Sequence, residues 1–124
     1  MKLAVCGILP VLGLYLSISR KDDPNKIGFI GGKVDESENI EDALIRESLE
    51  ETGLSIEIDK HYEPFIGNDG EFTVYCYMIQ LRNEVQQPID ELETGVIKLA
   101  NKLQLTKASP FGSYNEKAFE WFNL

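Results

Sequence analysis

The sequence has few of the residues that form zinc sites or disulfide frameworks. Its 124 residues include one histidine and two cysteines. Cys6 and Cys76 are far apart, with no CxxC or Cys/His spacing that would indicate zinc. We expect both thiols to be buried, although the sequence leaves a disulfide between them open.

Basic residues are also scarce. Lys and Arg number 12 against 21 Asp and Glu, the formal net charge is −9, and no basic run exceeds two residues. Binding to DNA or RNA depends on clustered positive charge, so we expect no polymeric nucleic acid among the partners. The same acidity would repel a polyphosphate unless divalent cations and local bases such as Arg20 and Lys33 reverse the sign at the site.

No apolar stretch is long enough to cross a membrane as a helix. Residues 3–16 loosely imitate a secretion signal, but Gly7, Pro10 and Gly13 interrupt them, and a turn between two buried strands fits the pattern better. We therefore expect a cytoplasmic protein, monomeric or homodimeric, with no membrane partner. The length and apolar content suit a single domain over residues 1–124.

Apolar periodicity predicts a mixed β-sheet between helices. The expected strands are residues 3–9, 14–19, 27–30, 54–58 and 71–81. The last of these is apolar on both faces, which places it in the middle of the sheet with helices on each side. Residues 115–122 should supply the second helical layer, with 97–103 as a further candidate. The fold class that follows is α/β or α+β.

The segment between residues 27 and 54 contains the clearest local signals. A short apolar strand runs into Gly31 and Gly32 and then into an acidic loop. Asn39 has the character of an N-cap and Gly53 that of a C-terminal stop, which predicts a helix at Ile40–Thr52.

The apolar stripe of this helix becomes acidic along its length. At roughly 100° per residue, Ile40, Leu44, Glu47 and Glu51 share one stripe, and Glu50 lies beside it. A merely solvated helix would place its acids on the opposite face. The pattern therefore predicts carboxylates on the face that meets the protein.

Clustered carboxylates indicate a bound cation. They repel one another and are costly to desolvate, and a cation is the simplest compensation. Ligands that are all oxygen favour Mg²⁺, or Mn²⁺ in its place. The alternative is that Glu47, Glu50 and Glu51 are surface acids that pair with Arg46 and nearby lysines, as on many solvated helices.

The surrounding residues favour the metal, because they follow a long spaced pattern. The pattern is G-x5-E-x7-R-E-U-x-E-E-x-G-U, where U is a bulky apolar residue, and it is formed by Gly32, Glu38, Arg46, Glu47, Glu50, Glu51, Gly53 and Leu54. It resembles the signature of the Nudix hydrolase family at eight of nine specified positions, with Ser48 as the departure. The resemblance implies an α/β/α sandwich, and the short chain is similar to MutT-type members.

The resemblance also implies roles for the motif residues. In the family, the glutamates of the motif hold Mg²⁺ together with the carbonyl of the second glycine. These positions correspond here to Glu47, Glu50, Glu51 and Gly32. The motif arginine and first glutamate usually orient the ligands through an ion pair, which corresponds to Arg46 and Glu38.

Other candidates lie outside the motif. Many family members take a further glutamate from a late loop as ligand or general base, and Glu91 is preferred here over Glu93; a solvated loop is the alternative for both. Arg20 and Lys33 are candidates for phosphate contact, although an ordinary exposed arginine would account for Arg20 equally well.

Base recognition is expected near the chain end. In MutT-type members an asparagine there contacts the base, and Asn115 occupies a comparable place; the alternative is that it caps the last helix. Tyr114 and Phe111 could stack on a base, whereas Phe119, Trp121 and Phe122 fit the packing of an amphipathic helix.

The function expected from the resemblance is Mg²⁺-dependent cleavage of a pyrophosphate bond in a nucleotide. The leading substrate is a nucleoside triphosphate, which would give the monophosphate and pyrophosphate. Alternatives are hydrolysis of ADP-ribose, a nucleotide sugar or a dinucleoside polyphosphate. A Nudix-fold module that binds a nucleotide without catalysis is a third class, disfavoured because every motif carboxylate is present.

Overall fold

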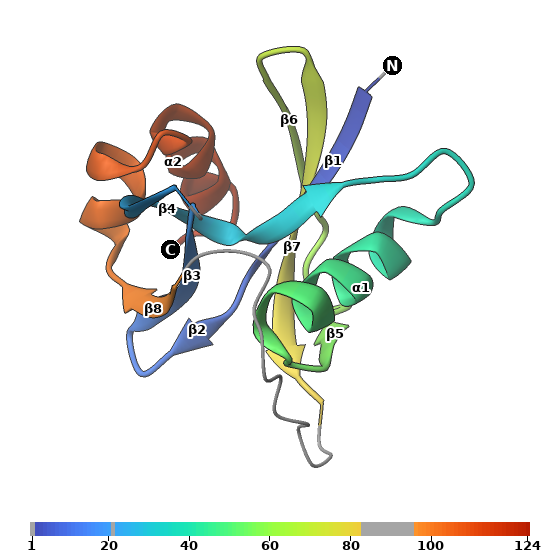
Figure 1. Ribbon diagram of the computed structural model, residues 1–124, viewed down its shortest axis with the longest axis horizontal. Coiled ribbons are helices and arrows are strands. Elements are labelled where there is room, and N and C mark those ends of the chain that lie inside the picture. Colours follow the sequence, from blue (N-terminus) through green and yellow to red (C-terminus); the bar gives the residue numbers. More distant parts are fainter. Residues whose placement is uncertain (1, 21, 83–95) are drawn as a thin grey trace.

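The computed structural model describes residues 2–20, 22–82 and 96–124 (Figure 1). Its strands are β1 (Lys2–Ile8), β2 (Pro10–Val11), β3 (Leu14–Arg20), β4 (Asp23–Lys33), β5 (Ile56–Ile58), β6 (Phe65–Asp69), β7 (Phe72–Leu81) and β8 (Ile97–Ala100). Its helices are α1 (Ile40–Thr52), α2 (Gly112–Trp121) and the π-helix η1 (Gln104–Ala108). None of the helices in these ranges is both long and apolar enough to span a membrane.

The strands form one mixed sheet, as expected. Its main order is β2-β3-β4-β1-β7-β5, while β6 pairs with β7 and β8 pairs with β3. β1 and β7 are parallel, and the other pairs are antiparallel. β7 has partners on both sides, so its predicted central position is confirmed.

Two apolar clusters lie on opposite faces of this sheet. One packs under α2 and includes Phe29, Val74 and Phe119. The other packs under α1 and includes Leu44 and Tyr77. Figure 1 shows α1 and α2 on either side of the β1 and β7 pair, which is the predicted sandwich.

Helix α1 begins and ends where its sequence predicts. The Asn39 side chain accepts hydrogen bonds from the backbone N–H groups of Glu41 and Asp42, which satisfies donors of the first turn. Gly53 has φ of 75°, a left-handed conformation that glycine adopts without steric cost, and it ends the helix.

Three sequence expectations about the strands and the last helix were wrong. β4 is much longer than residues 27–30, because antiparallel pairing with β3 and β1 extends it through both glycines. Residues 97–100 form β8 rather than a helix, since they satisfy the open edge of β3. Trp121 is 56% exposed instead of core, and its indole N–H donates to the carbonyl of Glu63.

The two cysteines are neighbours in space. Cys6 of β1 and Cys76 of β7 are direct partners in the parallel ladder, and both are free thiols. Cys76 is buried as expected, and burial raises the pKa of its thiol, whereas Cys6 is half-buried because it borders a cleft.

Candidate active site

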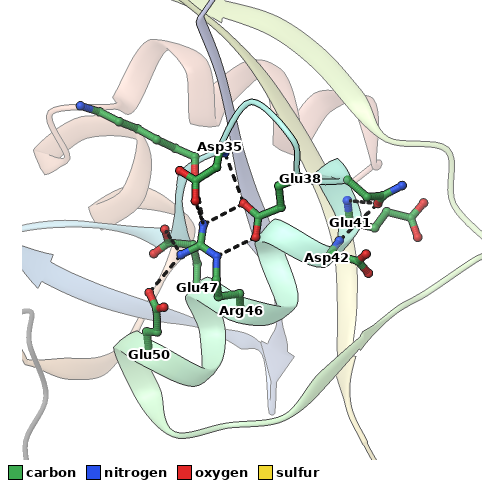
Figure 2. Close-up of polar contacts among 9 residues, drawn as sticks. Asp35, Glu38, Glu41, Asp42, Arg46, Glu47 and Glu50 are labelled. Carbon is green, nitrogen blue, oxygen red and sulfur yellow. Dashed lines mark hydrogen bonds and ion pairs between the residues drawn. The ribbon is translucent and has the colours of Figure 1, made fainter.

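Arg46 of α1 is the centre of a network of charged side chains from this helix and from the loop before it (Figure 2). Its Nε and Nη2 donate to the two carboxylate oxygens of Glu38 at 2.7 and 2.9 Å. Its Nη1 donates to Glu47 and to Glu50, at 3.1 Å each. The two-point contact with Glu38 fixes the plane of the guanidinium, so the remaining nitrogen points at the two motif carboxylates.

The acids around Arg46 differ in their electrostatics. The hydrogen bonds from Arg46 hold the pKa of Glu38 below its usual value. The pKa of Glu47 is raised, because burial outweighs the attraction of Arg46 and the charge of Glu50 adds repulsion. The Glu47 side chain is 18% exposed and that of Glu50 is 49% exposed. Burial therefore penalises the charge of Glu47 even with Arg46 beside it.

The Gly31-Gly32 pair brings the backbone of β4 against the motif carboxylates. The Gly31 N–H donates to Glu51 at 3.0 Å. A Cβ on Gly32 would lie 2.5 Å from the carboxyl carbon of Glu47, and one on Gly31 would lie 2.1 Å from the Val5 carbonyl oxygen. Both glycines allow a close approach that a side chain would block: Gly31 lies against the backbone of β1, and Gly32 lies against the carboxylate of Glu47.

These residues provide a donor set suited to a hard divalent cation. Glu47 and Glu51 meet the glycine backbone from α1, and Glu50 is exposed enough to reorient. Within the described ranges, no three acidic, histidine or cysteine side chains already converge on one metal position. Arg46 instead supplies the positive charge between Glu47 and Glu50. The chemistry of the set, carboxylates and a backbone carbonyl, fits Mg²⁺ or Mn²⁺.

A cleft of about 530 Å³ opens beside this cluster, between the sheet and α2. Its charged lining residues are three bases and three acids: Arg20, Lys26, Lys33, Asp22, Glu51 and Asp69. Arg20 and Asp22 form an ion pair at 3.3 Å. The lining is thus formally neutral within a chain of net charge −9, so a polyanion meets less repulsion here than on the average surface.

The α2 wall of the cleft uses its polar groups largely within the fold. The Tyr114 hydroxyl donates to the Val74 carbonyl at 2.9 Å, and the Asn115 Nδ2 donates to the Leu105 carbonyl at 3.0 Å. Phe111 occupies the N-cap position and Asn115 lies inside the helix, so the reading of Asn115 as a cap was wrong. Phe111 is 41% exposed and lines the cleft.

A model of the NUDIX domain family matches residues 11–122. The chain belongs to the Nudix family. It is a hydrolase of a family that acts on nucleoside diphosphates linked to another moiety. The match spans the motif and most of both layers, so it confirms the family that the motif predicts. A search of curated proteins finds no match.

Solved structures are similar to this Nudix domain over nearly its whole length. An ADP-ribose pyrophosphatase from Streptococcus suis 89-1591 has a TM-score of 0.68 and 19% identity, covering 96% of this chain and 90% of its own. A MutT protein from Methanosarcina mazei Go1 has a TM-score of 0.67 and 19% identity, with 98% and 94% covered. The E. coli dihydroneopterin triphosphate pyrophosphohydrolase has a TM-score of 0.66 and 17% identity, and the match covers 98% of this chain and 96% of that protein. At these identities the likeness shows the fold.

The predicted site residues of this Nudix hydrolase fall into two adjoining groups. The cleft contains Gly32, Glu51, Arg20, Lys33, Tyr114 and Asn115. The network around Arg46 contains Glu38, from the loop before α1, and Glu47 and Glu50, from α1 itself. Glu91 and Glu93 lie outside the described residues. Sequence reasoning missed Lys26, Asp69 and Phe72 in the cleft lining, because only strand pairing brings them there.

Proposed function

We propose that this Nudix hydrolase uses Mg²⁺, or Mn²⁺ in its place, to cleave a nucleoside triphosphate into the monophosphate and pyrophosphate. The observation that carries the proposal is one cleft in which Gly32 and Glu51 share the lining with Arg20, Lys33 and Asn115. A single ligand can therefore reach the motif and the α2 wall together. The volume of about 530 Å³ lies within the range of small-molecule sites.

The proposed metal ligands are the three motif glutamates and the backbone carbonyl of Gly32. Divalent cations bound there would offset phosphate charge and lower the pKa of an attacking water. Support comes from the raised pKa of the Glu47 carboxyl, since a buried carboxylate of this kind is stabilised by a positive charge. Glu51, held by the Gly31 N–H, faces the cleft from the motif.

Arg46 is proposed as a positioning residue. Its contact with Glu38 holds the guanidinium, which in turn holds the half-buried Glu47 through one hydrogen bond. The same nitrogen contacts the more exposed Glu50, whose side chain can turn away without leaving a buried charge. Glu38 and Arg46 thus keep Glu47 in place while Glu50 adapts.

Bases in the cleft are proposed to receive the phosphates. Lys33 follows the two glycines directly, and its ammonium lies 5.8 Å from the centre of the Phe72 ring, on the cleft floor. Arg20 lies on β3 and is tied only to the exposed Asp22 among the described residues, so its guanidinium is available for a bidentate phosphate contact.

The α2 wall is proposed to hold the base. Asn115 lines the cleft, and its carbonyl oxygen can accept a hydrogen bond from the base because its Nδ2 is already used. Phe111 offers a partly exposed ring for stacking. Tyr114 can offer only an acceptor, since its hydroxyl proton goes to Val74.

A substrate panel tests the proposal. Nucleoside triphosphates, ADP-ribose, a nucleotide sugar and a dinucleoside polyphosphate are incubated with Mg²⁺, and products are separated by chromatography. We expect monophosphate and pyrophosphate from a triphosphate, abolished by excess EDTA and restored by Mg²⁺ or Mn²⁺. If kcat/KM is higher for ADP-ribose or a nucleotide sugar than for any triphosphate, that compound is the substrate and the triphosphate proposal is wrong. Nucleotide binding with no turnover under any metal would indicate a binding module.

A further inference from the structure

A carboxylate lies in the cleft away from the motif. Asp69 ends β6 and pairs with Phe72 of β7 across their hairpin, and both residues line the cleft. β4, β1, β7 and β6 are successive neighbours in the sheet, so three strand spacings, about 14 Å, separate β6 from the glycines of β4. Cation ligands lie within about 2.6 Å of the ion, so Asp69 cannot share a cation with Glu51 at Gly31.

No contact within the fold accounts for this charge. Across residues 2–20, 22–82 and 96–124, no hydrogen bond or ion pair engages the Asp69 carboxylate. Lys2, from the strand beyond Phe72, pairs with Glu71 at 2.8 Å instead. Asp69 is partly exposed and lines the cleft, so its carboxylate is open to a ligand that brings hydrogen-bond donors to it.

Asn115 gives a second, independent indication of the same kind. It is 2% exposed and lines the cleft. The Leu105 carbonyl can only accept, so the amide must turn its Nδ2 toward it, which leaves Oδ1 as an acceptor with no donor among the described residues. The Tyr114 proton is committed to Val74. Asp69 and Asn115 therefore present acceptors, and a matching ligand must present N–H donors.

Resting on the proposed function, we propose that Asp69 is a specificity-determining residue that accepts hydrogen bonds from a base in which a ring N–H adjoins an exocyclic amino group. Guanine and pterins share this edge. Two parallel N–H donors match the two oxygens of one carboxylate, as in an arginine–carboxylate pair. Hypoxanthine and uracil have the ring N–H without an adjoining amino group. Adenine and cytosine have the amino group beside a ring nitrogen that accepts.

The test compares kcat/KM for GTP, ITP, UTP and dihydroneopterin triphosphate in the wild type and in Asp69→Asn. GTP and ITP differ only in the amino group, and the pterin separates the two sources of the edge. We expect the wild type to favour GTP, the pterin or both over ITP by about 10-fold or more, as for a hydrogen bond to a charged group. Asp69→Asn should bring that ratio close to one, because kcat/KM should fall more for GTP and the pterin, which donate two hydrogen bonds, than for ITP, which donates only the ring N–H.

Glu71→Gln is the matched control, because it removes the same charge from the same hairpin at a residue outside the cleft lining. It should keep the wild-type ratio. An unchanged ratio in Asp69→Asn, or a wild type that does not distinguish the amino group, overturns the inference. Calorimetric binding of GDP and IDP separates it from the proposed function: a preference for GDP that Asp69→Asn removes, without any turnover, supports the inference and contradicts only the hydrolase.

Discussion

The α1 side and the α2 side of the site are built in different ways. On the α1 side, Glu38, Arg46, Glu47 and Glu50 come from one short segment and interact mainly with one another. On the α2 side, Tyr114 and Asn115 come from one helix, and their side chains donate hydrogen bonds to backbone carbonyls of other elements, those of Val74 and Leu105. The α1 side is an electrostatic cluster whose charges need one another, and the α2 side is a wall of the core that also faces a ligand. We expect changes on the first side to alter kcat and on the second to alter KM.

The strongest test of this difference is Glu50→Gln and Glu51→Gln. Each should lower kcat on the order of 1,000-fold while the protein stays folded, because the amide keeps the shape of the side chain but loses the charge that holds a cation. Steady-state kinetics with a triphosphate in Mg²⁺, together with melting curves in EDTA, measure both effects. Glu116→Gln, on the exposed face of α2, is the control. If both motif variants keep near-normal kcat, the acids are a surface cluster.

The two neighbouring glycines separate activity from stability. In Gly32→Ala the new methyl meets the flexible carboxylate of Glu47, so the fold should survive and kcat should fall about 10- to 100-fold. In Gly31→Ala the methyl meets the Val5 backbone at 2.1 Å, so β1 and β4 must separate, at a cost of about 3 kcal/mol in the free energy of unfolding. Denaturant unfolding and steady-state kinetics of both variants test this difference. Equal stability of the two variants would contradict the assignment of Gly31 to the fold and of Gly32 to the site.

On the α2 side, Asn115→Ala should raise KM about 10-fold and leave kcat and Mn²⁺ affinity nearly unchanged. It should also lower the free energy of unfolding by about 1 kcal/mol, since the Leu105 carbonyl loses its donor. Ser113→Ala, an exposed position on the same helix, is the comparison. A loss of stability with KM unchanged would mean that Asn115 serves the fold alone.

The smallest expected effect concerns Glu47. Its folded pKa is raised, so the folded, metal-free protein holds the proton more tightly than the unfolded chain does and loses stability as pH rises through the folded pKa. Glu47→Gln removes that loss and should raise Tm at pH 7.5 in EDTA by about 3 °C. The control Glu57→Gln, at an exposed position on β5, should leave Tm unchanged. An unchanged or lower Tm for Glu47→Gln would show that Arg46 already compensates the charge.

The α1 side could be predicted in detail because its signals are local. The Asn39 cap, the Gly53 stop and the acidic stripe all act within one helix, where spacing determines geometry. The length of β4 could not be predicted, because its polar first half is held by pairing with β3 rather than by its own apolar pattern. Residues 97–103 illustrate the same limit, since a short apolar run suits a helix or a strand until an open edge selects one.

The α2 side was predicted only where the family resemblance pointed to it. Asn115 and Tyr114 were expected there, but Asp69 was not, because nothing near it in the sequence marks it as part of a site. It reaches the cleft through the register of β6 on β7 and of β7 on β1. Such residues become visible only when long-range pairing is known.

β7 has a consequence for how such an enzyme can diversify. Its even-numbered residues Val74 and Cys76 face the α2 layer, and its odd-numbered residues Tyr75 and Tyr77 face the α1 layer. Point substitutions at even positions can therefore remodel the cleft floor while the support of the motif helix is untouched. An insertion or deletion of one residue would exchange the two faces and damage both layers at once. New substrate preferences can therefore arise through substitutions in this strand, whereas insertions and deletions in it would disrupt the fold.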